Sequence, residues 1–259
     1  MTLLAVDNVS KAFGGVHAIE GVSFDIRRGA VHSIIGPNGA GKTTLLNMLT
    51  GIYVPDSGQI RLADRNLTGQ ATHRFADAGI ARTFQNLQVF FNMTALENVM
   101  TGRYLREPCS LLAALLHTRA LVRAERSCRE VARRLLQRVG LADYFEARAD
   151  AMPYGALKRL EIARALAAEP QLLLLDEPAA GLNPTEAREI DALIKRLAAD
   201  GTTVILVEHN MRLVMEVSDH VLVLDHGKKL AEGPPAQIGR DPRVIEAYLG
   251  VEQELQSHA

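Results

Sequence analysis

Short, uninterrupted runs of apolar residues recur along this chain, with helix-like patterns between them. The runs, several of them rich in β-branched side chains, are VHSII from residue 31, LLLLD from 172, TVILVEH from 203 and VLVLD from 221. Strands that are apolar on both faces are typical of a parallel sheet covered by helices on both sides. The pattern therefore predicts an α/β fold built on a largely parallel sheet.

The N-terminal part follows a different pattern, because apolar and polar residues alternate there more nearly in twos. The segments concerned are LLAVDNVSKAF, HAIEGVSFDI and QIRLADRNL. Alternation of this kind indicates strands with one buried face. We therefore predict antiparallel strands that form one edge of a mixed sheet.

The strand pattern stops between Thr94 and about Leu166. Thr94 is followed three residues later by Glu97, which predicts a capping box at the start of a helix. Apolar residues then recur at helical spacing as far as Gly140, a residue suited to end a helix. We predict one domain over residues 1–259, with its core in 1–93 and 167–259 and a helical subdomain inserted at about 94–166.

The charge of the chain is nearly balanced, with 29 basic and 30 acidic residues. No overall field attracts nucleic acid or an anionic membrane. The stretch from Arg103 to Arg138 has nine arginines against three glutamates. Few aromatic residues lie among them, which favours a solvated helix face over a nucleic-acid site, so we expect no nucleic-acid partner.

The N-terminus MTLLAVDNVS lacks the basic-then-apolar layout of a signal peptide, and the chain has only two cysteines, Cys109 and Cys128. The longest apolar stretches include LLAALL from 111 and LLLL from 172. Both fall far short of the ~20 residues that a membrane-spanning helix needs. We expect a cytoplasmic protein that does not cross a bilayer by itself.

A glycine-rich segment, GPNGAGKTT, lies between the apolar run VHSII and the helical segment LLNML. A phosphate loop needs glycines so that backbone N–H groups can face an anion, a lysine for the outer phosphates and a hydroxyl for Mg²⁺. Thr43 supplies that hydroxyl. The predicted site consists of Gly36, Pro37, Asn38, Gly39, Ala40, Gly41, Lys42, Thr43 and Thr44.

Two carboxylates lie at the end of the apolar run LLLLD: Asp176 is its last residue, and Glu177 follows directly. The carboxyl ends of parallel strands face the crevice in which ligands bind. Asp176 is therefore a candidate Mg²⁺ ligand, and Glu177 a candidate base for an attacking water. The pair alone is a weak signal, since such residues often cap helices, but it is a strong one beside a phosphate loop.

These motifs, together with RTFQ at 82–85, PYGALKRLEIARAL, AAGLNP at 179–184 and VEH at 207–209, resemble the nucleotide-binding subunit of ABC transporters over nearly the whole chain. The wording is most similar to the ATPases of branched-chain amino acid importers. The resemblance implies a P-loop NTPase fold with a mixed sheet, an antiparallel β edge and an inserted helical subdomain, and implies ATP and Mg²⁺ as cofactors.

The resemblance also implies roles for single residues. Phe13 takes the place of the aromatic residue that stacks on adenine, and Gln85 that of the glutamine that senses Mg²⁺ and the attacking water. His209 would contact the γ-phosphate. Gly181 and Asn183 match the segment that crosses the seam of an ATPase dimer. Glu177, His209 and Gln85 are thus the expected catalytic residues, with Thr43, Gln85 and Asp176 at the metal.

In the family that the chain resembles, one helix start closes over the ATP of the opposite subunit and usually reads Leu-Ser-Gly-Gly-Gln. This chain departs from that motif. Met152, Pro153, Tyr154, Gly155 and Ala156 stand in those places. Tyr154 and Gly155 are expected to contact nucleotide, but Pro153 has neither hydroxyl nor N–H, and Ala156 has no side-chain amide. Proline suits a first helical turn, so we expect the helix to form with a weaker grip on the anion.

Together with this resemblance, these features predict the ATP-hydrolysing, energy-coupling subunit of a branched-chain amino acid importer, peripheral on the inner face of the cell membrane. The expected partners are transmembrane permeases, a second ABC ATPase in a suspected heterodimer and, indirectly, a solute-binding protein outside the cytoplasm. Two alternatives stay open: the ATPase of another transport system such as lipopolysaccharide export, and a nucleotide-gated scaffold that scarcely hydrolyses ATP. The assignment of branched-chain amino acids as the cargo depends on the resemblance alone.

Overall fold

The computed structural model describes residues 1–104, 106 and 119–248, and it contains a six-stranded sheet of order β10-β9-β3-β8-β7-β6. Five of these strands are parallel, and β10 pairs antiparallel with β9 at the edge. The strands are β3 (Val31–Ile35), β6 (Ile80–Arg82), β7 (Leu172–Asp176), β8 (Thr203–Val207), β9 (His220–Asp225) and β10 (Lys228–Gly233). The predicted α/β fold class and all four strands expected from the apolar runs are confirmed.

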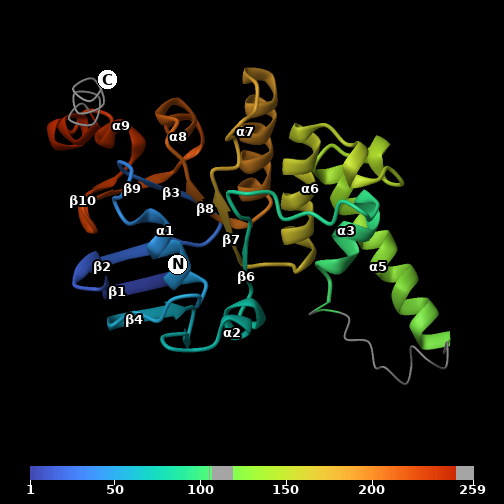
Figure 1. Cartoon of the computed structure of the whole chain (residues 1–259), viewed down its shortest axis with the longest axis horizontal. Helices are drawn as coiled ribbons and strands as arrows, with labels where there is room; N and C mark the ends of the chain where they lie inside the picture. The colour runs from blue at the N-terminus through green and yellow to red at the C-terminus, as the bar shows by residue number, and fades with distance from the viewer. Residues whose placement is uncertain (105, 107–118, 249–259) are drawn as a thin grey trace.

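The alternating N-terminal segments are antiparallel, as predicted, but they do not join the parallel sheet. They form a separate four-stranded sheet of order β2-β1-β4-β5 (Figure 1). Its strands are β1 (Thr2–Phe13), β2 (Val16–Arg27), β4 (Ser57–Leu62) and β5 (Arg65–Asn66). The antiparallel edge of the mixed sheet is instead β10, whose sequence KKLAEG is too polar to predict a strand.

Helices cover both faces of the parallel sheet, as its two-sided apolar strands require. On one face, α1 lies between the two sheets, and its Leu45, Leu46 and Leu49 pack with residues of both. The helices are α1 (Lys42–Leu49), α2 (Thr72–Asp77), α3 (Ala95–Thr101), α5 (Arg119–Arg138), α6 (Tyr154–Ala167), α7 (Pro184–Ala199), α8 (Met211–Val217) and α9 (Pro235–Ile238). Two short 3₁₀ turns are η1 (Ala142–Tyr144) and η2 (Ala149–Ala151).

A helical lobe formed by α3, α5 and α6 lies at one end of the molecule, away from the antiparallel sheet (Figure 1). The predicted capping box at the start of α3 is confirmed: the Thr94 hydroxyl accepts from the Glu97 N–H, and the Glu97 carboxylate accepts from the Thr94 N–H. Gly140 follows α5 with φ 76°, the left-handed conformation expected after a helix end.

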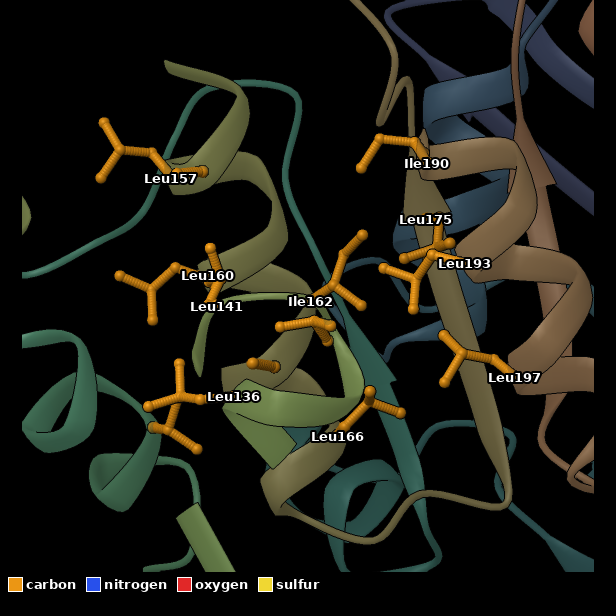
Figure 2. Packing of buried hydrophobic residues seen from close by; sticks show 14 of the residues in the cluster. Leu136, Leu141, Leu157, Leu160, Ile162, Leu166, Leu175, Ile190, Leu193 and Leu197 are labelled. Atoms are coloured by element: carbon orange, nitrogen blue, oxygen red, sulfur yellow. The ribbon is translucent and has the colours of Figure 1, made fainter. Parts of the chain in front are cut away.

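The lobe and the sheet share one apolar core, and α6 lies between them. In Figure 2, Ile162 on α6 points toward Leu175 of β7 and Leu193 of α7, whereas Leu160 points toward Leu136 in the lobe. A helix with apolar contacts on two sides is held firmly in place, because fully burying one leucine is worth about 2 kcal/mol. The start of α6 is therefore well positioned relative to the sheet.

Some residues used in the sequence-based predictions lie outside the described part of the chain. They are Cys109, the run LLAALL at 111–116 and Leu249 and Gly250 at the end of IEAYLG. None of the helices within the described part combines the length and the apolar character that a bilayer span requires.

Candidate functional site

The loops that follow four neighbouring parallel strands meet at the carboxyl edge of the sheet. The strands β3, β8, β7 and β6 are adjacent in that order. They are followed by the phosphate loop, by Glu208 and His209, by Glu177 and by Gln85, respectively. The topology thus brings the predicted phosphate loop and the predicted residues His209, Glu177 and Gln85 to one edge, although they are far apart in the sequence.

The phosphate loop turns sharply between β3 and α1, and two of its glycines leave no room for a side chain. A Cβ on Gly36 would lie 2.1 Å from the Leu224 carbonyl oxygen, and a Cβ on Gly41 would lie 2.4 Å from the Ala18 carbonyl oxygen. Gly41 is the N-cap of α1 with φ 97°. The loop therefore places the backbone at the start of α1, where helix N–H groups can bind an anion.

Lys42 lies over this loop. Its Nζ donates to the carbonyl oxygens of Gly36, at 2.7 Å, and Pro37, at 2.9 Å. Burial lowers the pKa of Lys42, while the nearby carboxylates of Glu177 and Asp176 act to raise it. The ammonium group is thus held among loop carbonyls and two carboxylates, at the place where a phosphate group would be bound. Thr43, the next residue of α1, is exposed.

The two carboxylates, Asp176 and Glu177, lie in different environments. Asp176, at the end of β7, is buried, whereas Glu177 is partly exposed. Glu177 has φ 48°, and its N–H donates to the Val207 carbonyl oxygen at 2.9 Å. A left-handed conformation is strained for a residue other than glycine, and such strain is concentrated at functional sites. The conformation turns the chain sharply away from β7 at the edge of the sheet.

Gln85 and His209 approach different oxygens of the Glu177 carboxylate. The Gln85 Nε2 donates to Glu177 Oε2 at 3.2 Å, and His209 Nδ1 lies 3.7 Å from Glu177 Oε1. His209 is largely exposed, so its ring is open to a ligand. The structure therefore brings together all three predicted catalytic residues around one carboxylate.

Arg82 joins this site through a contact that the sequence did not predict. Its Nη2 lies 2.8 Å from Asp176 Oδ2, and its Nη1 donates to Asn47 Oδ1 of α1 at 2.7 Å. Both charged side chains of the Arg82–Asp176 pair are almost fully buried. The nearest signal in the sequence is the position of Arg82 at the start of RTFQ.

Glu208 is a second residue that sequence reasoning missed. It is 1 % exposed, and its Oε1 accepts from the Ala179 N–H at 3.1 Å. Burial raises its pKa, against the opposing effects of the Ala179 N–H and His209. Glu208 thereby links the loop after β8 to the segment 179–184 that follows Glu177. Only its place inside VEH hinted at a role.

Phe13 lies at the end of the β1–β2 hairpin, whose second strand approaches Gly41 through Ala18. Its ring is 42 % exposed and packs edge-on against Tyr53, with 5.1 Å between ring centroids. A partly exposed aromatic ring on the hairpin that approaches the phosphate loop suits stacking on a nucleobase.

The remaining predicted residues form a second group at the start of α6. Pro153 is the N-cap of α6 rather than a residue of its first turn, and it makes no side-chain cap hydrogen bond. A Cβ on Gly155 would lie 2.6 Å from Glu186 Oε1, and one on Gly181 would lie 3.2 Å from the Tyr154 ring. The structure thus joins Tyr154 and Gly155 to the segment of Gly181, where the Asn183 side chain caps α7.

The side chains that meet at the carboxyl edge of the sheet include donors that fit a hard divalent cation. Thr43, Asp176 and Gln85 offer a hydroxyl, a carboxylate and an amide oxygen, and Mg²⁺ prefers one or two such protein ligands together with phosphate oxygens. In the described part of the chain, no three His, Cys, Asp or Glu side chains form a metal cage by themselves. The arrangement therefore suits a cation that arrives with a polyphosphate.

Comparison with known families gives two matches. Residues 19–180 match the ABC transporter family, and residues 228–254 match a family described as branched-chain amino acid ATP-binding cassette transporter. The first match contains the phosphate loop, Gln85, the start of α6 and both carboxylates of LLLLDEP.

Individual relatives are similar over almost the whole chain. The chain is 45 % identical over 249 residues to the high-affinity branched-chain amino acid transport ATP-binding protein BraF of Pseudomonas aeruginosa. The matched region covers 96 % of this chain and 98 % of that protein. Identity to the corresponding Escherichia coli protein LivG is 43 %, with the same coverage.

Solved structures of ATP-binding cassettes are also similar to this chain. A nucleotide-free ATP-binding cassette from an ABC transporter superposes with a TM-score of 0.83 at 33 % identity, covering 96 % of this chain and 99 % of the other. The ADP conformation of MJ1267, an ATP-binding cassette of an ABC transporter, gives the same values.

Proposed function

This chain belongs to the ABC transporter family, and we propose that it hydrolyses ATP to drive the import of branched-chain amino acids. Two observations support the proposal. The curated relatives that share 43–45 % of their residues with the chain are branched-chain amino acid transport proteins, and the C-terminal segment matches the corresponding family. The geometry around Glu177 supports hydrolysis.

In the proposed mechanism, the N–H groups of the phosphate loop and the Lys42 ammonium bind the outer phosphates of ATP. Thr43, Asp176 and Gln85 would hold Mg²⁺, which would neutralise charge on the phosphate oxygens. Glu177 orients the attacking water and accepts its proton. Gln85 fixes the Glu177 carboxylate by donating to Oε2, and His209 lies where its exposed ring can reach the terminal phosphate.

The second group of residues supports a dimeric assembly. The start of α6 contacts the Gly181 segment through Tyr154 and the side chain of Glu186 through Gly155. In the proposed assembly, it closes over ATP bound to another subunit, so each ATP lies between two chains. Phe13, Tyr154 and Gly155 would then complete nucleotide sites from both sides of the seam.

We further propose that the other subunit is a related ATPase rather than a second copy. Pro153 offers neither hydroxyl nor N–H to the γ-phosphate, and Ala156 offers no side-chain amide. Each lost charge-assisted hydrogen bond costs about 1.5–3 kcal/mol, or about ten- to a hundredfold. A homodimer would have this defect at both sites, whereas a heterodimer would have it at one.

An apolar groove between the sheet and the lobe supports docking on a permease. Phe84 and Phe90 line it and are 42 % and 46 % exposed. Arg164 lies 5.5 Å from the Phe90 ring centroid and covers part of the groove with charge. A short permease segment that binds here would contact residues next to Gln85, and it would hold the chain at the inner face of the membrane.

Isolation of the complex from its native membrane tests the proposal. We expect hydrophobic permease subunits and a second ATPase to co-purify with the chain, and transport of leucine or isoleucine to depend on ATP. Vigorous, cooperative ATP hydrolysis by the purified chain alone would contradict the heterodimer. Transport of an unrelated cargo would contradict the proposed substrate.

A further inference from the structure

Two charged residues on α6 are buried more deeply than a helix surface requires. Lys158 is 2 % exposed and Glu161 is 3 % exposed. Lysine and glutamate are almost never fully buried unless they are paired, because removing a charge from water is costly. Their burial therefore needs an explanation in the contacts that they make.

Both side chains bind the backbone of the segment that carries Gln85. Lys158 Nζ donates to the Gln85 carbonyl oxygen at 3.1 Å. Glu161 Oε1 accepts from the N–H groups of Phe84 and Gln88, each at 3.4 Å. The two side chains thus hold the chain at Gln85 itself, at the residue before it and three residues after it.

The same lysine also reaches the start of α6. Its Nζ lies 5.8 Å from the centroid of the Tyr154 ring, a distance at which a cation is attracted to an aromatic face. Tyr154 in turn packs against Gly181. Lys158 therefore contacts both the first residue of the helix and the backbone of Gln85, whose side chain binds Glu177.

We propose that Lys158 and Glu161 are positioning residues that fix the Gln85 segment to α6. When nucleotide bound to the other subunit displaces the start of α6, the Gln85 segment then moves with the helix, and the Gln85 amide moves relative to Glu177. The two nucleotide sites of the assembly are then linked within this chain. This inference rests on the proposed function, because it requires a second subunit that presents ATP to α6.

Hydrogen exchange tests the contacts directly. The N–H groups of Phe84 and Gln88 are expected to exchange slowly in the wild-type chain and at least about tenfold faster in Glu161→Ala. Glu161→Gln keeps an oxygen acceptor and is expected to preserve the protection. The Leu45 N–H in α1, which donates to Gly41, is the internal control and should be unchanged. Equal exchange in all three proteins would overturn the proposal.

Kinetics of the complex isolated from membranes test the consequence. Lys158→Met is expected to lower kcat by about ten- to a hundredfold, the loss of one charge-assisted hydrogen bond, while ATP affinity stays within about twofold. Lys158→Arg retains a donor and should recover most of kcat. The double variant Lys158→Met with Glu161→Gln removes the charges of both buried side chains and should remain slow.

Arg159→Met is the matched control, because Arg159 is on the same helix but pairs with Glu189 of α7 at 3.0 Å. It should leave kcat unchanged. A wild-type kcat in Lys158→Met, or a parallel loss of kcat and ATP affinity, would overturn the inference. A wild-type complex that neither binds nor hydrolyses ATP would instead overturn the proposed function, and the exchange experiment would still decide whether the contacts exist.

Discussion

Replacing Arg82 by methionine isolates the most deeply buried ion pair of the candidate site. The side chains of Arg82 and Asp176 are 6 % and 9 % exposed, and 2.8 Å separates Nη2 from Oδ2. Methionine keeps much of the aliphatic length but leaves the Asp176 carboxylate without its cation. It also removes the donor to Asn47 on α1.

The expected loss of stability is large because one charge stays buried. Removing one partner of a buried pair costs about 3–5 kcal/mol. For a chain of this size, each kcal/mol lowers Tm by about 2–4 °C, so we expect a fall of about 6–20 °C. Arg212→Met is the matched control: Arg212 and Glu216 are 3.0 Å apart but 81 % and 45 % exposed, and such pairs contribute less than about 1 kcal/mol.

Thermal and urea unfolding of the nucleotide-free chain, followed by circular dichroism, measures the difference. Asp176→Asn in the Arg82→Met background removes the second charge and should recover at least half of the lost stability. An Arg82→Met variant within about 0.5 kcal/mol of the wild type, or a double variant no more stable than the single one, would refute the assignment of a stabilising buried pair.

Other predictions concern catalysis and pH. Glu177→Gln should retain ATP binding and lose at least about a hundredfold in kcat, and normal hydrolysis would exclude Glu177 as the base. Pro153→Ser should raise ATPase activity several-fold if the α6 start is limiting; an unchanged rate would show that it is not. Burial, with His220 adding to it, lowers the pKa of His32 to about 4. The unfolded chain therefore binds a proton that the native chain does not, and stability present above pH 6.5 is lost as the pH falls toward about 4. Unfolding free energies should fall by about 1.4 kcal/mol from about pH 7.5 to about 5.5, and by less in His32→Gln; an equal fall in both proteins would contradict this origin.

The parts of the molecule that could be predicted from the sequence depend on local chemistry. Strands β3, β7, β8 and β9 are apolar on both faces, so a run of consecutive apolar residues is enough to predict that they are buried. The phosphate loop and the capping box at Thr94 are equally local, since glycine conformation, lysine reach and side-chain capping act within a few residues. These features required no knowledge of the topology.

The parts that escaped prediction depend on pairing between distant segments. Arg82 meets Asp176 because β6 pairs with β7 in a register that aligns Arg82 with Leu174, and no local pattern encodes that register. Lys158 and Glu161 resemble ordinary solvated charges of a helix until the Gln85 segment is placed against them. The alternating N-terminal strands show one buried face but not which sheet they join.

Calorimetric titration of the purified chain with ATP, in the presence of Mg²⁺, tests the central claim most directly, namely that the phosphate loop around Lys42 binds a nucleotide. We expect saturable binding by the wild-type chain and by Glu177→Gln, and a loss of at least about tenfold in affinity for Lys42→Ala, which removes the only ammonium group bound to the loop carbonyls in the described part of the chain. Equal affinity of Lys42→Ala and the wild type, or no binding by either protein, would contradict the account.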